Sequence, residues 1–213
     1  MEDAAIINLW KDYSRKLDES LSLNRKNTED IIHMKVKSML NSMQPLKVFA
    51  IVVGILWVCF VDSLIIGLFH AASIFFLASA IIQVLLTKLA IGIYLYQLIL
   101  IQQVDISQPV LATQNKLARL QSTTLWVTRI LFLQLPVWTT FFWTKNMFTG
   151  ESIAFNTLPV TVTLLFTLAA IWLFANIRYE NRHTKWFKLM FDGKEWTPVM
   201  KSMELLDEMK EYK

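Results

Sequence analysis

Residues 46–70 read LKVFAIVVGILWVCFVDSLIIGLFH, and this stretch decides which kind of fold the chain can adopt. Only one lysine, one aspartate, one serine and one histidine interrupt its apolar side chains. A membrane hydrocarbon core about 30 Å thick requires roughly 20 apolar residues in helical form, so the stretch is long enough to cross it. Every backbone polar group must be bonded internally there, and we therefore expect an α-helix.

Three further apolar stretches predict an all-α, polytopic membrane protein with four transmembrane helices. They run from about 71 to 101, 125 to 143 and 158 to 177. The first two spans have almost no loop between them and should form a tight antiparallel hairpin. The second stretch would extend roughly 46 Å as a helix, so its C-terminal part should tilt or leave the bilayer. Pro136 predicts a kink in the third span.

The composition indicates a protein that lies partly in a bilayer and partly in water. Of its 213 residues, 54% are hydrophobic and 18% are charged, which is more apolar and less charged than an average soluble domain. The N-terminus carries no basic segment, and no apolar run begins before about residue 46, so we expect no cleavable secretory signal. The single Cys59 excludes an internal disulfide framework.

Lysine and arginine residues are concentrated on one side of the four predicted spans. Seven precede the first span, two occupy the loop after the second, and five lie within residues 178–194. The opposite side offers Lys145. Basic residues favour the cytoplasmic side, so we expect both termini and the central loop to be cytoplasmic. Trp126 and Trp143 flank the third span in the manner of interfacial aromatic anchors.

The central loop, residues 102–124, is predicted to form a cytoplasmic stalk with the long second and third helices. Residues 105–109, which begin with Asp105, read as a turn into a helix: Ser107 can cap the first turn and Pro109 fits within it. We expect the third helix to start near Gln108. Apolar residues then recur at helical spacing, at Val110, Leu117, Leu120 and Leu125.

Amphipathic helices are predicted in the cytoplasmic segments, residues 1–45 and 178–213, on either side of the membrane bundle at 46–177. The first has an apolar stripe with helical periodicity, formed by Ile6, Trp10, Tyr13, Leu17 and Leu21. A second should begin near Asn27, with acidic residues in its first turn. Its apolar residues are Ile31, Ile32, Val36, Met39, Leu40 and Met43. A C-terminal helix should start near Pro198, with Met200, Met203, Leu206 and Met209 on one side.

The first amphipathic helix has two interpretations, which the sequence leaves open. It can pack on the stalk or lie on the membrane surface. It can instead offer its stripe to the groove of a partner protein. Its charges are mixed rather than strongly basic, which argues against adsorption to lipid.

Three charged residues stand out as candidates well inside the predicted spans: Asp62, Lys88 and Arg129. Charges at such positions are candidates for function. We interpret them mainly as anchors and bundle-facing polar groups, with an ion path or lipid head-group contact as alternatives. Asp62 and Lys88 should differ in depth by roughly 15 Å, so no direct pair is expected. Arg129 is close enough to the inner surface to snorkel.

The sequence contains no motif that would support catalysis or cofactor binding. His33, His70 and His183 are isolated and do not have metal-ligand spacing. Neither a phosphate-binding glycine loop nor a Gly-x-Ser-x-Gly elbow is present. We therefore expect neither an enzyme nor a cofactor. The basic residues 178–188 read as a positive-inside signal rather than a site for nucleic acid.

Several short motifs carry a resemblance to a known family. They are residues 9–11 and 16–20, residues 54–58, residues 101–110 with Lys116, Leu117 and Leu120, residues 183–186 and the C-terminal helix. Through these motifs the chain resembles a family of small four-helix inner-membrane proteins of the Bacteroidota. Their genes often lie beside genes for extracytoplasmic-function sigma factors. The resemblance covers nearly the whole chain.

This resemblance implies a membrane-bound anti-sigma factor or related regulator, which would hold a sigma factor at the bacterial inner membrane. The sequence lacks the Cys and His motif of zinc-binding anti-sigma domains, so binding would be purely helical. The expected partner-binding residues are the stripe, which includes Trp10, Tyr13, Leu17 and Leu21, and the stalk residues Asp105, Pro109 and Leu117.

Two alternatives to a regulatory partner stay open. The chain can be a structural subunit or a homo-oligomer such as a homodimer, for which Ala50 and Gly54 provide a small-xxx-small pair. It can also be a small transporter or channel that uses Asp62, Lys88 and Arg129, although we find no internal repeat of the kind that many transporters have.

Overall fold

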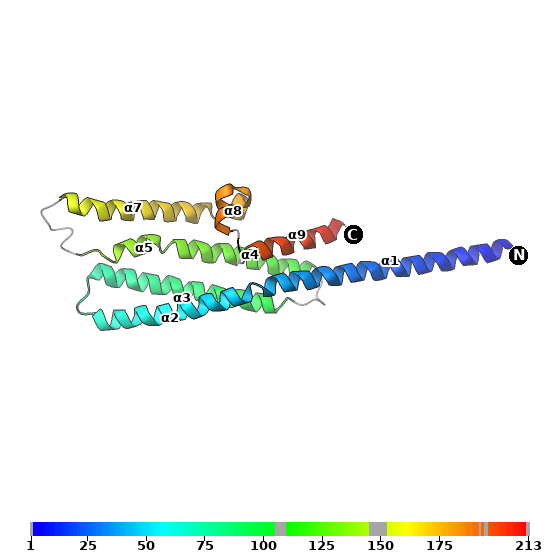
Figure 1. Cartoon of the computed structure of the whole chain (residues 1–213), viewed down its shortest axis with the longest axis horizontal. Coiled ribbons are helices and arrows are strands. Elements are labelled where there is room, and N and C mark those ends of the chain that lie inside the picture. Colours follow the sequence, from blue (N-terminus) through cyan, green and yellow to red (C-terminus); the bar gives the residue numbers. More distant parts are fainter. Residues whose placement is uncertain (1, 105–109, 145–152, 192, 194–195, 212–213) are drawn as a thin grey trace.

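A computed structural model describes residues 2–104, 110–144, 153–191, 193 and 196–211. Within these ranges the chain forms helices and no strand. The helices make an elongated bundle from which one long helix projects (Figure 1). In chain order they are α1 (Glu2–Asn41), α2 (Gln44–Leu68), α3 (Ile74–Gln102), α4 (Val110–Phe132), α5 (Leu135–Thr140), α7 (Ile153–Asn176), the 3-10 helix η1 (Tyr179–His183), α8 (Lys185–Phe191) and α9 (Thr197–Glu211).

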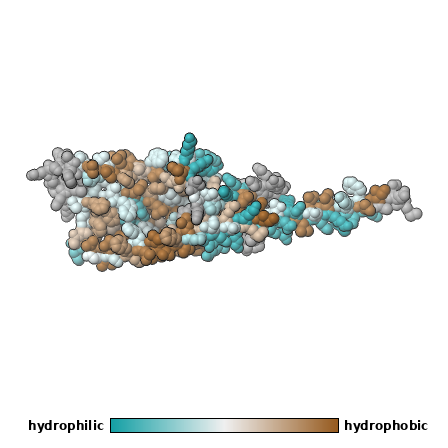
Figure 2. All heavy atoms as spheres, viewed as in Figure 1, coloured by the Kyte–Doolittle hydropathy of each residue, from teal (hydrophilic) through white to brown (hydrophobic). Residues whose placement is uncertain are grey.

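Three helical segments among the described residues are long and apolar enough to cross a membrane. They are Ile6–Leu68, whose apolar part is α2, together with Ile74–Gln102 and Thr157–Asn176. Hydrophobic residues dominate the face of the bundle seen in Figure 2, whereas polar residues gather toward the projecting helix. Large exposed apolar surfaces mark contact with lipid or protein, so this distribution indicates association with a membrane.

The predicted hairpin is formed by α2 and α3. The backbone amides of Ala71 and Ala72 both donate to the carbonyl of Leu68, which closes the turn. Close packing of the two helices depends on Gly54, because a Cβ atom there would lie 3.1 Å from the side chain of Ile91. The small residue therefore serves contact inside the chain, so Gly54 does not support the homo-oligomer alternative.

The predicted third span is divided into two helices. α4 ends at Phe132, and α5 begins at Leu135 with Pro136 in its first turn. Proline lacks a backbone donor and is tolerated in a first turn, which explains why the helix restarts there. The broken segment still follows α3: the hydroxyl groups of Ser79 and Thr140 lie 2.7 Å apart. The kink predicted at Pro136 is thus observed as a break.

The prediction of two N-terminal helices is wrong, because α1 is one continuous helix of 40 residues. The proposed second start fails at Thr28, whose hydroxyl donates to the carbonyl of Asn24 at 2.9 Å instead of capping a new first turn. Arg25 and Glu29 form an ion pair across the same region at 3.9 Å. No glycine or proline occurs before Pro45, so nothing in the backbone forces an interruption.

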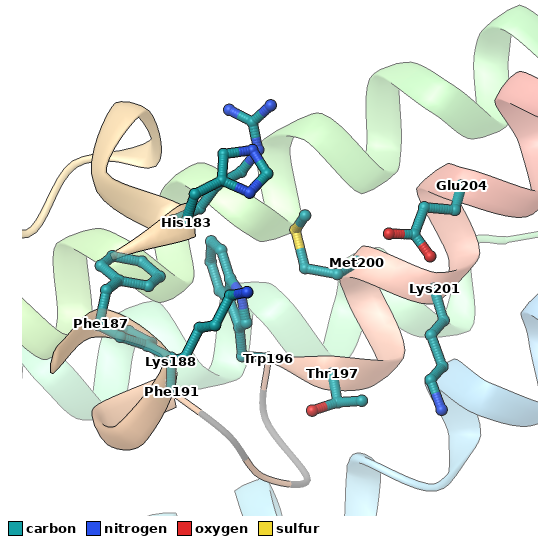
Figure 3. Close-up of a pocket in the computed structure, with 10 residues that line it drawn as sticks. His183, Phe187, Lys188, Phe191, Trp196, Thr197, Met200, Lys201 and Glu204 are labelled. Carbon is teal, nitrogen blue, oxygen red and sulfur yellow. The ribbon is translucent and has the colours of Figure 1, made fainter. Parts of the chain in front are cut away.

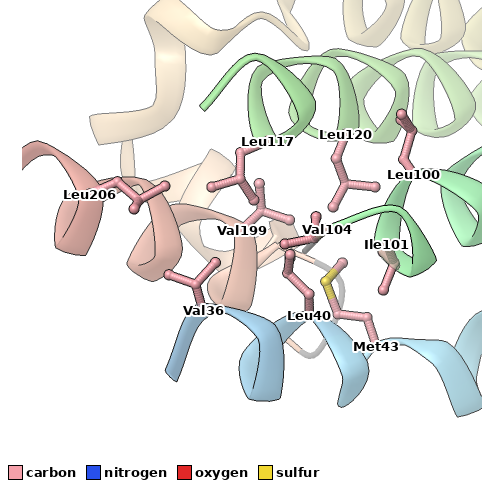
Figure 4. Packing of buried hydrophobic residues seen from close by; sticks show 10 residues of the cluster. All are labelled: Val36, Leu40, Met43, Leu100, Ile101, Val104, Leu117, Leu120, Val199 and Leu206. Carbon is pink, nitrogen blue, oxygen red and sulfur yellow. The ribbon is translucent and has the colours of Figure 1, made fainter. Parts of the chain in front are cut away.

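The C-terminal half of α1 and one face of α9 pack against the C-terminal end of α3 and the N-terminal half of α4, and we call this packed region the stalk. Side chains from these four helices point toward one another in a single cluster (Figure 4). Its buried members are Val36, Leu40, Met43, Leu100, Ile101, Val104, Leu117, Leu120, Val199 and Leu206. Burial of each side chain contributes roughly 1.5–3 kcal/mol, so the cluster fixes α1 to the bundle.

The predicted C-terminal helix is present as α9, which begins at Thr197. Leu206 is fully buried and Met203 is partly buried, as the predicted apolar side requires. The buried face also includes Ser202. The side chain of Met209 and the predicted start of the third helix near Gln108 lie outside the described residues.

Candidate docking helix and polar sites of the bundle

The N-terminal half of α1 extends away from the bundle (Figure 1). Every residue from Ile6 to Thr28 is exposed. The predicted stripe is among the most exposed apolar surface of the chain, with Trp10 at 74% and Tyr13 at 71% of full exposure. Leu17 and Leu21 are also exposed. In this structure the stripe therefore does not pack on the stalk, which was one of the arrangements expected from the sequence.

Ion pairs within the helix support this exposed half of α1. Asp12 pairs with Arg15 at 2.7 Å and with Lys16 at 3.3 Å, one helical turn away. Exposed pairs at this spacing stabilise a helix by about 0.3–0.5 kcal/mol each. Residues 1–30 carry seven acidic and five basic side chains. A helix with this charge balance is suited to a protein surface rather than to anionic lipid or nucleic acid.

The predicted stalk residues do not all belong to an accessible surface. Leu117 is completely buried in the stalk cluster, beneath α1 and α9. Its assignment as a partner-binding residue is therefore corrected: it holds the stalk together. Asp105 and Pro109 lie outside the described residues.

Asp62 and Lys88 form a direct ion pair, with 3.2 Å between Lys88 Nζ and Asp62 Oδ2, so the prediction against a pair is wrong. Contact between Gly54 and Ile91 sets the register of the hairpin. With this register the backbone positions of Asp62 and Lys88 differ in depth by only about 8 Å. Side chains on a helix tilt toward its N-terminus. In this hairpin the tilt directs Asp62 away from the turn and Lys88 toward it, so the two side chains converge.

Arg129 connects α4 to the end of α7. Its Nε donates to the carbonyl of Ile177 at 2.6 Å. Its guanidinium group lies 5.4 Å from the ring centre of Trp126 and 5.8 Å from that of Phe174. Cations are favourable near the carbonyl end of a helix and over aromatic rings. Arg129 thus makes contacts on different elements from those that carry Asp62 and Lys88.

A fourth charged residue at the bundle, Lys47, was missed in the sequence analysis. It is fully buried, its Nζ donates to Oε1 of Gln97, and it lies 5.0 Å from the ring centre of Tyr94. A usable signal exists, because Val36, Leu40 and Met43 lead to Lys47 at helical spacing. That periodicity places the lysine on the face that becomes buried.

A concavity with several charged residues in its lining lies where η1, α8 and α9 meet (Figure 3). It is a cavity of about 390 Å³. Phe187, Phe191 and Trp196 form its aromatic floor, with 4.2 Å between the ring centres of the two phenylalanines. Its polar lining includes Arg182, His183, Lys188, Lys201 and Glu204. The basic residues predicted as a positive-inside signal therefore converge with α9 at one depression.

Metal-binding clusters and similarity to known proteins provide no further indication of function. Within the part of the chain that the structure describes, no cluster of three or more His, Cys, Asp or Glu residues could hold a metal ion. No protein-family model matches the chain, and no curated protein or solved structure shows significant similarity to it.

Proposed function

We propose that the chain is a regulatory protein of a bacterial inner membrane that captures a cytoplasmic protein on the N-terminal half of α1. The four crossings are α2, α3, the broken α4–α5 segment and α7. The distribution of lysine and arginine supports a cytoplasmic stalk, α1 and α9. The resemblance noted above favours a sigma factor as the captured protein.

The observation that carries this proposal is the exposed stripe of α1. Trp10, Tyr13 and Leu17 are large apolar side chains that water surrounds in the isolated chain. Tryptophan and tyrosine contribute strongly to binding at the centres of protein interfaces. An amphipathic helix that places such side chains at helical spacing fits an apolar groove on a partner.

The attachment of α1 to the stalk defines how the partner would be held. The stalk cluster immobilises the helix at Val36, Leu40 and Met43. Trp10 lies 30 residues before Leu40 in the sequence, which corresponds to about 45 Å along the continuous helix. The captured protein would thus be held at a defined distance from the membrane, where release requires only loss of contact with α1.

The alternatives receive less support from the geometry. Asp62 and Lys88 neutralise each other on the side of the hairpin, and Arg129 is bonded at the end of α7. These contacts do not favour a shared ion path. We therefore propose a protein-binding role rather than transport.

Affinity capture from native membranes, followed by mass spectrometry, tests the proposal. Wild type should retain a sigma factor. The amount captured by Trp10→Ala/Leu17→Ala should be lower by a factor of about ten or more, since two central apolar anchors are removed. A matched control is Arg15→Ala/Glu19→Ala, because these residues lie on the opposite face of the same exposed helix. Equal capture by wild type and the stripe variant, or no enriched cytoplasmic protein, would refute the assignment.

A further inference from the structure

The Asp62–Lys88 pair lies on the outside of the hairpin, close to its middle. Asp62 precedes the end of α2 by six residues, and Lys88 follows the start of α3 by fourteen. Asp62 therefore lies about 9 Å from the end of α2, and Lys88 lies about 21 Å from the start of α3. Because the side chains converge, their charged groups meet near the centre of a hydrocarbon core about 30 Å thick.

Contact with lipid hydrocarbon is energetically unfavourable for this ion pair. The two side chains retain 41% and 53% of their exposure, so much of each charged group faces outward. Hydrocarbon supplies neither hydrogen-bond donors nor acceptors. Charged residues at the bilayer centre therefore usually face other protein segments or a water-filled cavity. The pair marks a surface of the hairpin that a second polar surface would stabilise.

The surface beside the pair is shaped for close contact with another helix. Cys59, Ser63 and Gly67 follow one another at a spacing of four residues on α2, and all three are exposed. The Ser63 hydroxyl already donates to the carbonyl of Cys59 at 2.8 Å, so it needs no further acceptor. On α3, Gly92 lies one turn from Lys88, and a Cβ atom there would meet nothing within 4 Å. Small residues allow membrane helices to approach closely.

We propose that this face of the α2–α3 hairpin binds the same face of a second copy of the chain. A two-fold axis along the membrane normal places identical surfaces at equal depth. Asp62 of each copy then opposes Lys88 of the other, and the four charges alternate in sign. This self-complementarity selects a second copy as the occupant, because one patch supplies both charges that the interface requires.

The proposal rests on the membrane insertion of α2 and α3 but not on capture of a cytoplasmic protein by α1. The two surfaces lie on different parts of the chain, since the stripe occupies residues 6–21 and the pair lies within the hairpin. Failure of either experiment therefore leaves the other informative.

Oxidative crosslinking in native membranes tests the interface directly, because Cys59 is the one cysteine in the sequence. A disulfide between copies requires Cα atoms within roughly 7 Å, which the small-residue surface permits. Wild type should give a disulfide-linked dimer that a reducing agent converts back to monomer. The control is Cys59→Ser/Leu165→Cys, which moves the thiol to an exposed position on α7, a different helix of the bundle. That control should stay monomeric.

Two charge variants then separate the ion pair from the apolar surface. Asp62→Leu/Lys88→Leu should lower the crosslinked fraction about tenfold, since interhelical polar contacts in membranes contribute roughly 1–2 kcal/mol. Removal of charges from lipid favours insertion, so loss of crosslinking would not reflect failure to fold. The exchange Asp62→Lys/Lys88→Asp preserves self-complementarity and should retain the dimer. Absence of a wild-type dimer, equal yield from the leucine variant, or crosslinking of Cys59 to a different membrane protein would overturn the proposal.

Discussion

Lys47 is a charged side chain in an otherwise apolar stretch, and its contacts explain why the bundle tolerates it. The ammonium group donates to Gln97 and lies near the ring of Tyr94, so burial is compensated by a charge-assisted hydrogen bond and an aromatic face. The local sequence shows the periodicity of this position but not its partners. Gln97 is 50 residues away, and only the hairpin register brings the two together.

We expect Lys47→Ala to lower the free energy of unfolding by about 2–4 kcal/mol. The change leaves a cavity and deprives the buried Gln97 of its donor. Thermal unfolding of the detergent-solubilised protein measures this effect. Lys35→Ala, at an exposed position of α1, should change stability by less than about 0.5 kcal/mol. Similar losses from the two variants would show that Lys47 is not a buried structural residue.

At the scale of elements, α1 shows how a correct local signal can give a wrong boundary. Asn27, Thr28 and the acidic residues that follow form a good helix start. A start signal is used only if the preceding backbone leaves helical geometry, and no residue before Pro45 compels that. The cap residues are consequently absorbed into a longer helix, where Thr28 bonds to the preceding turn.

The continuity of α1 predicts a narrow distance between spin labels on either side of Thr28. Cysteines at Ser22 and Lys35, in a Cys59→Ser background, should be separated by about 20 Å between backbone positions. Asn27→Pro should broaden the distribution, because proline disrupts a helix interior. Electron–electron dipolar spectroscopy provides the measurement. A broad wild-type distribution, indistinguishable from that of the proline variant, would contradict a continuous helix.

At the scale of the whole molecule, the stalk joins an apolar bundle to a polar, projecting helix. The cluster in Figure 4 combines residues from α1, α3, α4 and α9, which are distant in sequence. Sequence periodicity identified most of these apolar faces, including Val36, Leu40, Leu117 and Leu206. It did not show that Leu117 would be covered, because coverage depends on where α9 returns to the bundle.

The arrangement predicts opposite accessibility of the hairpin turn and of the C-terminal half of α1, which lie beyond opposite ends of α2. In a Cys59→Ser background, cysteine at His70, an exposed residue at the hairpin turn, should react with a membrane-impermeant maleimide in intact cells. Cysteine at Lys35, on the stalk side, should react only after the membrane is permeabilised, because the basic residues favour a cytoplasmic location. Labelling of Lys35→Cys in intact cells would reverse the proposed orientation.

The sequence by itself determined the helical class, the membrane-crossing lengths of α2, α3 and α7, the hairpin, the break near Pro136 and the start of α9. These features follow from local apolar length, helical periodicity and chain-breaking residues. Only the tertiary structure decided that α1 is continuous with its N-terminal half exposed, that Lys47 is buried, and that Asp62 meets Lys88. Burial and pairing depend on the register between segments far apart in the chain, and local sequence patterns do not specify that register.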